Sequence, residues 1–308
     1  MAVASRRGIL DDPRVPSALI PEKPWRIVLL SSILPATLGL DAIARSLGHE
    51  TVALLTPRLP DGALDEMVTR YHELLDGAPA HLDVCVVPDK ARLVRLLEAY
   101  QPDLCLCLGY RWLLPPEVLA IPGLGVLNGH PSVLPNWRGP FPTAWAVREG
   151  DAELGMSFHL MDGAFDTGPV LAQGSRPMPE DYDWPIFQPV FAELAQELLP
   201  KALARIAQGD RGDIQPPGDY PYAGLFPASF SELDLSQSAA VVHRHVASWR
   251  FTFTQEGEQG PLTTLDGERV RVLRTSLADP GGGSLALACA DGPLWVLESE
   301  LLHDTGTD

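Results

Sequence analysis

Short segments that are apolar at almost every position alternate with longer segments of helical periodicity along most of this chain. The first apolar segments lie at 25–31, 51–55 and 83–87, and amphipathic segments at 61–75 and 89–100 follow two of them. Strands without polar alternation are buried on both faces, as in parallel sheets that helices cover from both sides. The pattern therefore predicts an α/β domain with a mostly parallel sheet. Further strands are expected at 103–108, 125–127, 154–161 and 169–173, and further helices at 36–47 and 185–207, the last interrupted by Pro189 and Pro200.

The composition changes after residue 208. Residues 209–222 are dense in Gly, Pro and Asp, which is typical of a linker. A helical segment and four short strand-like segments follow, and Asp-Gly and Gly-rich turns join the strands. This pattern predicts a small β-barrel domain. We therefore expect an N-terminal arm at 1–24, the α/β domain at 25–208, the linker at 209–222 and the β-barrel domain at 223–308.

Charge and composition narrow the class of protein. The chain of 308 residues has a net charge of −17, so it repels polyanions at long range. No apolar run approaches the roughly 20 residues of a membrane-spanning helix, and no apolar stretch follows Arg6 and Arg7 as in a secretory signal. The four cysteines form no C-x-x-C pair, which favours reduced thiols. We expect a cytoplasmic protein that uses no membrane and no metal.

Two segments carry the polar side chains of greatest chemical interest. Asn128 and His130 stand in the sequence N-G-H-P-S-V-L-P, directly after the predicted strand at 125–127. Asp166 stands in D-G-A-F-D-T-G-P-V, after the predicted strand at 154–161. Ligands of open parallel sheets bind beyond the carboxyl ends of the strands. The order of the elements therefore predicts that an amide, an imidazole and a carboxylate meet over one cleft.

Together these motifs resemble those of the 10-formyltetrahydrofolate-dependent formyltransferases. The resemblance covers about residues 25–207, and the segment 231–249 resembles the start of the C-terminal domain of the methionyl-tRNA and amino-sugar members. It implies a Rossmann-like catalytic domain, an OB-like C-terminal barrel and 10-formyltetrahydrofolate as co-substrate. It also implies that Asn128, His130 and Asp166 are the catalytic residues.

These side chains suit attack of an amine on a formyl carbon, in which negative charge develops on the formyl oxygen. The Asn128 amide is one donor for that oxygen, and a protonated His130 would be a second. An ionised Asp166 can hold His130 in its charged form and help to remove the amine proton. Neither a metal nor a covalent enzyme intermediate is required.

The resemblance also implies further contacts. Residues of the segment L-G-Y-R-W-L-L-P and of the loop before Asp166 are expected to bind the folate: Gly109, Tyr110, Arg111, Trp112, Leu113, Ala164 and Phe165. From the residues themselves, Ser132 and Arg138 are predicted to bind substrate, and for Arg138 this is an anionic acceptor or the folate. A local turn at Ser132 and a surface salt bridge at Arg138 are the alternatives. For His159, the sequence leaves a structural role and a place in the cleft both open.

The acceptor is predicted from departures from the family's subtypes. The segment 31–36 has no glycine, so it lacks the Gly-rich phosphate loop of the glycinamide ribonucleotide enzymes. The enzymes that act on methionyl-tRNA use basic surfaces, whereas residues 220–308 carry 5 Arg and Lys against 12 Asp and Glu. We therefore expect a small or carrier-bound amine: an amino sugar, an amino acid derivative or a biosynthetic intermediate.

Other functions remain alternatives at this point. Methionyl-tRNA is a second acceptor because the domain plan matches, and hydrolysis of formyltetrahydrofolate requires the same three residues. A metal-dependent hydrolase using His130, His159 and Asp166 as ligands would leave Asn128 without a task. A binding module without activity would have no physical need for all three groups. The oligomeric state is not predicted.

Overall fold

The computed structural model describes residues 23–252 and 259–302, which form two compact units. Unit 1 comprises residues up to Arg138, Gly155–Ser175 and Val190–Tyr220, and unit 2 comprises Gly139–Leu154, Arg176–Pro189 and the residues from Pro221 onward. Both units are therefore assembled from separate stretches of chain, whereas the predicted domains were consecutive. Of the predicted arm at 1–24, all but the last two residues lie outside the described residues.

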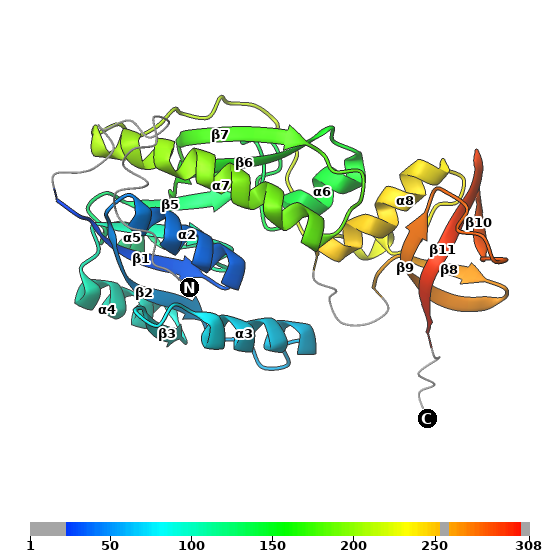
Figure 1. The fold of residues 1–308 in the computed structure, drawn as a ribbon, viewed down its shortest axis with the longest axis horizontal. Helices are drawn as coiled ribbons and strands as arrows, with labels where there is room; N and C mark the ends of the chain where they lie inside the picture. The colour runs from blue at the N-terminus through cyan, green and yellow to red at the C-terminus, as the bar shows by residue number, and fades with distance from the viewer. Residues whose placement is uncertain (1–22, 253–258, 303–308) are drawn as a thin grey trace. The chain divides into compact units, whose positions relative to one another are not determined.

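A seven-stranded sheet, with strand order β3-β2-β1-β4-β5-β6-β7, is the centre of the α/β fold (Figure 1). Strands β1 to β5 pair in parallel, and β6 runs antiparallel to β5. The mostly parallel sheet predicted from the apolar segments is thus confirmed. The strands are β1 (Arg26–Ser31), β2 (Glu50–Pro57), β3 (Asp83–Val87), β4 (Leu104–Leu108), β5 (Val126–His130), β6 (Glu153–Leu160) and β7 (Val170–Pro177).

Helices cover both faces of this sheet because successive strand residues point to opposite sides. One face, with Ile27 and Leu29, packs against α2, α3 and the second part of α7, and the other, with Val28 and Leu30, packs against α4 and α5. Apolar side chains on both faces explain why the strands lack polar alternation. The helices are α2 (Leu34–Ser46), α3 (Asp65–Gly77), α4 (Lys90–Tyr100), α5 (Pro116–Leu119) and α7 (Trp184–Ala207).

Two local predictions are wrong. Helix α7 is continuous through Pro189 and Pro200, because packing of its apolar face outweighs the hydrogen bonds that the prolines remove. Strand β5 does not end before the Asn-Gly-His segment but includes it. Its antiparallel pairing with β6 matches Asn128 with His159 and His130 with Ser157, so the ladder extends through these polar residues.

Unit 2 contains a curled four-stranded antiparallel sheet of order β10-β11-β9-β8, in agreement with the predicted barrel-like C-terminal part (Figure 1). Val242 and Val246 of α8 pack on Val270, Val272 and Leu294 of the sheet. The other elements of this unit include α6, which the sequence did not predict. The elements are α6 (Pro142–Glu149), α8 (Ala239–Ser248), β8 (Leu262–Leu265), β9 (Glu268–Ser276), β10 (Ala286–Cys289) and β11 (Gly292–Leu301), with single 3₁₀ turns at Ala228–Phe230 and Trp249–Phe251.

The predicted linker begins by packing on unit 1. Asp213 forms an antiparallel bridge with Val170 of β7 through two backbone hydrogen bonds of 2.8 Å. The Arg205 guanidinium donates to both carboxylate oxygens of Asp213, at 2.8 and 3.1 Å. Gln215 exposes only 8% of its surface. The first part of this segment therefore extends the edge of the sheet near the loop that carries Asp166.

Candidate active site

Asn128 and His130 point to the same side of β5 because they are two residues apart in an extended strand. Both are buried, with 9% and 4% of their surfaces exposed. Antiparallel pairing with β6 places His159 directly opposite Asn128. Two neighbouring strands thus present three polar side chains at one place in the sheet.

Asp166 reaches the same place from the loop between β6 and β7. Its backbone has a φ of 54°, in the left-handed region that side chains other than glycine rarely adopt. The carboxylate of Asp162 accepts hydrogen bonds from the Ala164 amide at 3.1 Å and from the Thr167 hydroxyl at 2.7 Å. These internal bonds fold the loop back on itself so that the Asp166 carboxylate faces the sheet.

The structure brings the three predicted residues together. The Nδ2 atom of Asn128 lies 3.4 Å from Oδ1 of Asp166, and Nδ1 of His130 lies 3.6 Å from its Oδ2. The predicted convergence of amide, imidazole and carboxylate is therefore present in the fold. Asn128 also donates from Nδ2 to Nε2 of His159 at 3.1 Å. This hydrogen bond is shorter than the contact with Asp166 and fixes the orientation of the Asn128 amide.

The protonation of His130 follows from its partners. Its Nε2 lies 2.8 Å from the Trp137 carbonyl, which can only accept, so this nitrogen carries a hydrogen. Burial lowers the pKa of His130, and the nearby His159 lowers it further, while the Asp166 carboxylate and the Trp137 carbonyl oppose the shift. Near neutral pH the ring is therefore neutral, with its Nδ1 lone pair toward Asp166. A protonated His130 as resting donor, as expected from the sequence, is not favoured.

His159, which the sequence left open, lies in the site. It exposes 1% of its surface. Its ring and the ring of His130 are arranged edge to face, with 6.5 Å between the ring centroids. Its Nδ1 lies 3.2 Å from the Leu160 carbonyl, so Nδ1 donates there and Nε2 can accept from the Asn128 amide. The same Nε2 atom also lies 3.4 Å from Oδ1 of Asp166, so His159 contacts both Asn128 and Asp166. Only the strand register decides that this side chain faces Asn128, and the sequence alone did not fix the register.

The residues predicted to bind folate follow β4 and precede Asp166. Gly109 and Arg111 are exposed, and the rings of Tyr110 and Trp112 contact each other edge to face at 5.8 Å. The buried Tyr110 hydroxyl has no hydrogen-bond partner among the described residues. Ala164 is exposed, and Phe165 exposes 47% of its surface. Exposed backbone and an exposed ring are groups that a flat heteroaromatic ligand can use, whereas the buried Tyr110 hydroxyl is out of reach of such a ligand.

Ser132 and Arg138, predicted to bind substrate, both contact the protein itself. The Ser132 hydroxyl donates to the Asn136 carbonyl at 2.7 Å and closes the turn after His130. Arg138 donates from Nε and Nη2 to the Oε1 atom of Gln215, at 3.0 and 2.6 Å. Gln215 was missed by sequence reasoning because it lies in the predicted linker.

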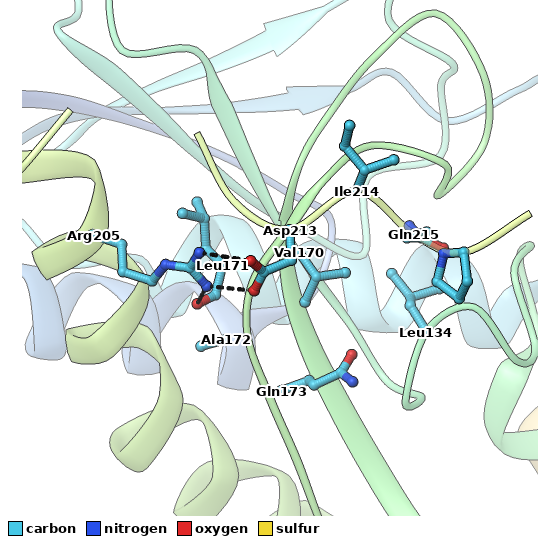
Figure 2. A pocket seen from close by; sticks show the side chains of 10 residues that line it. Leu134, Val170, Leu171, Ala172, Gln173, Arg205, Asp213, Ile214 and Gln215 are labelled. Atoms are coloured by element: carbon cyan, nitrogen blue, oxygen red, sulfur yellow. Dashed lines mark hydrogen bonds and ion pairs between the residues drawn. The ribbon is translucent and has the colours of Figure 1, made fainter. Parts of the chain in front are cut away.

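A separate surface pocket lies along β7 (Figure 2). It is lined by residues 170–173 and 213–216 together with Leu134 and Arg205, whereas the candidate trio of Asn128, His130 and Asp166 does not line it. In Figure 2 the Arg205 guanidinium pairs with Asp213, while Gln215 lies beside Leu134 at another part of the pocket. The convergent hydrogen-bonding groups lie at the trio, so we take the trio as the chemical centre.

Two further features of the described residues bear on function. Within residues 23–252 and 259–302, no group of three or more His, Cys, Asp or Glu side chains is arranged to hold a metal ion. No helix in the same part of the chain is long and apolar enough to cross a membrane.

Comparisons with known proteins show the family of this chain. The family model described as Formyl transferase matches residues 88–203, which include both motifs. A methionyl-tRNA formyltransferase of Pelobacter propionicus is 32% identical over 278 residues, which cover 82% of this chain and 82% of that protein. The chain belongs to the folate-dependent formyltransferase family. It is an enzyme for the transfer of formyl groups.

A further relative and two solved structures extend the similarity. A methionyl-tRNA formyltransferase of Marinobacter nauticus is 31% identical over 274 residues, 82% of this chain and 85% of that protein. HypX from Aquifex aeolicus in complex with tetrahydrofolic acid superimposes with a TM-score of 0.62 at 18% identity, over 90% of this chain and 44% of that chain. A 4-N formyltransferase from Francisella tularensis gives 0.58 at 16%, over 80% of this chain and 95% of that one. The two structures show the shared formyltransferase fold.

Proposed function

We propose that this formyltransferase transfers the formyl group of 10-formyltetrahydrofolate to the amino group of methionyl-tRNA. The observation that carries the reaction is the convergence of Asn128, His130 and Asp166, with Asp166 within 3.6 Å of both partners. The acceptor is supported by the relatives named above, which match most of this chain and are themselves named methionyl-tRNA formyltransferases.

Asn128 supplies the donor for the formyl oxygen. Its bond to Asp166 is long, at 3.4 Å, while its bond to His159 is 3.1 Å. The hydrogen directed at Asp166 is therefore the one released most easily to a substrate oxygen, while His159 keeps the amide in place. A donor fixed before the reaction lowers the barrier most, and loss of one such donor typically costs about 10²–10³ in rate.

His130 takes the proton that the attacking amine loses. The neutral ring carries its hydrogen on Nε2, bound to the Trp137 carbonyl, so Nδ1 is free to accept a proton directly or through one water. The resulting imidazolium lies 3.6 Å from the Asp166 carboxylate, which stabilises the positive charge. Asp166 thereby favours the charged form of His130 at the step that needs it.

The folate is proposed to lie against residues 109–113 and the exposed side of the Asp166 loop. Exposed backbone at Gly109 provides hydrogen-bonding groups, and the Phe165 ring provides an apolar surface. The bound co-substrate supplies the activated formyl group. When the amine has added to the formyl carbon, the bond from that carbon to N10 of the folate breaks, and the proton held by His130 passes to N10, so tetrahydrofolate leaves as a neutral amine. No metal takes part in this proposal.

Charge favours a second acceptor class, a small or carrier-bound amine. Residues 56–83 contain Arg58 and Arg70 against six acids, and residues 220–308 contain 5 basic and 12 acidic residues. Binding of tRNA draws on neutralisation of phosphates by Lys and Arg, so an acidic surface weakens it. An amino sugar or an amino acid derivative would not meet this penalty.

One experiment separates these acceptors. The protein is incubated with 10-formyltetrahydrofolate and, in parallel, with methionyl initiator tRNA, free methionine and a panel of amino sugars, and product masses are recorded. Formylation of the charged tRNA that weakens steeply with salt supports the proposal. Formylation of a small amine alone supports the second class, and release of formate without any acceptor indicates a hydrolase. The Asp166→Asn variant is the control and should form product far more slowly than the unaltered protein in every arm.

A further inference from the structure

Gln215 makes four hydrogen bonds that join three separate segments of unit 1. Its Nε2 donates to the backbone carbonyls of Asp166 and Gly168, both at 2.8 Å. Its Oε1 accepts from Nε and Nη2 of Arg138, at 3.0 and 2.6 Å. The side chain is therefore fully used, with both amide hydrogens on the loop of Asp166 and the oxygen on the segment that follows His130.

The side chain is held in one orientation. An amide can be turned over only if its oxygen can face the two carbonyls, but those carbonyls need donors and Arg138 needs an acceptor. Arg138 is itself fixed, because its guanidinium also lies over the Tyr220 ring at 5.8 Å. Gln215 is 8% exposed, so water cannot readily replace these bonds.

The loop that Gln215 holds is the one under strain. Asp166 has a φ of 54°, and a residue other than glycine in this region costs of order 1 kcal/mol or more unless its surroundings hold it. Asp162 fixes the start of the loop through Ala164 and Thr167, but bonds nothing after Thr167. The two bonds from Gln215 secure the carbonyls of Asp166 and Gly168.

We propose that Gln215 is a positioning residue that sets the place of the Asp166 carboxylate between His130 and Asn128. Gln215 donates its hydrogen bonds to the backbone carbonyls of Asp166 and Gly168, so it acts on the Asp166 carboxylate through the loop. The inference rests on the proposed catalytic use of Asp166 but is independent of which amine is the acceptor. A displacement of about 1 Å at a catalytic group is enough to cost about 10²-fold in rate.

The test compares two replacements of Gln215 with a matched control. Gln215→Glu keeps the length and the acceptor for Arg138 but places an acceptor against the two carbonyls. Gln215→Met removes the donors without adding charge. Gln173→Glu introduces the same charge in the same surface pocket, where the Gln173 side-chain oxygen accepts a hydrogen bond from the Ser157 hydroxyl at 3.3 Å.

Two measurements are made on each folded variant. We expect kcat to fall at least about tenfold in Gln215→Glu and Gln215→Met, with KM for 10-formyltetrahydrofolate within about threefold, because positioning is lost and binding is not. The NMR titration of the His130 ring should shift toward that of Asp166→Asn in both variants. Gln173→Glu should resemble the unaltered protein in both measurements.

The His130 titration needs no acceptor, so it tests the inference even if the proposed function fails. Unchanged titration and unchanged kcat in Gln215→Met would overturn the inference. So would an equal loss of kcat in Gln173→Glu, because the effect would then come from charge in the pocket. If one Gln215 variant does not fold, the other decides.

Discussion

The Nδ1 atom of His130 lies 3.6 Å from Oδ2 of Asp166, and the Nε2 atom of the same ring donates to the Trp137 carbonyl at 2.8 Å. The ring is thus oriented by one partner and electrostatically stabilised by the other. This arrangement gives a neutral base whose charged form has a carboxylate beside it.

Replacement of Asp166 by Asn should abolish this stabilisation while leaving the shape of the loop. We expect kcat to fall by about 10²–10⁴, the range for loss of general acid–base catalysis, with folate affinity within several-fold. Single-turnover rates and folate binding, measured separately, check the two parts. Wild-type turnover in Asp166→Asn would exclude the carboxylate from the chemistry.

The pH dependence should reflect a base that stays neutral to unusually low pH. Burial lowers the pKa of His130. The acid limb of the pH profile of kcat/KM should therefore have its midpoint below about 6.5, the pKa typical of histidine. Asp166 raises the pKa of His130, so Asp166→Asn should move the limb to still lower pH in its residual activity. A limb above pH 7 would contradict a neutral resting His130.

His159 should act by holding Asn128. His159→Leu removes the acceptor 3.1 Å from Asn128 Nδ2, so the amide loses its fixed orientation. We expect a loss of about tenfold or more in kcat, with partial recovery in His159→Gln, whose oxygen can accept instead. Equal activity of the Leu and Gln variants would show that the hydrogen bond is not used.

Gly168 should tolerate no side chain. A Cβ atom at this position would lie 1.8 Å from the Leu160 carbonyl oxygen, so the two backbones could not keep their spacing. We expect Gly168→Ala to lower the free energy of unfolding by about 3 kcal/mol or more. Gly163→Ala in the same loop, where nothing lies within 4 Å of the new Cβ, should change it by less than about 0.5 kcal/mol. Urea denaturation of both variants measures the difference.

Acid should destabilise the fold through buried neutral histidines. Burial lowers the pKa of His49 and of His245 to about 4, from 6.5. Between these values the unfolded chain binds more protons, so stability is complete above pH 6.5 and falls as the pH drops toward 4, by up to about 3 kcal/mol per histidine. Urea unfolding at pH 7.5 and 5 should show the loss, and His49→Gln should reduce it. The exposed His72, replaced by Gln, should leave the loss unchanged.

The amino-acid sequence determined the class of fold and which three residues make up the proposed catalytic trio. Strands buried on both faces must be apolar at nearly every position. The strands of the parallel sheet can therefore be recognised in the sequence before any contact between them is known. Asn128, His130 and Asp166 were found because their local motifs are short and unbroken. Such features depend on neighbours along the chain.

The tertiary structure decided the features that depend on contacts between residues far apart in the sequence. The antiparallel register of β5 and β6 placed His159 opposite Asn128, and a shift by one residue would have turned it away. Packing on β7 brought Gln215 from an apparent linker to the carbonyl of Asp166. Burial then lowered the pKa of His130, which favours the neutral ring that the proposed mechanism uses as a base. Register, long-range packing and desolvation are properties of the folded chain, because each depends on residues far apart in the sequence.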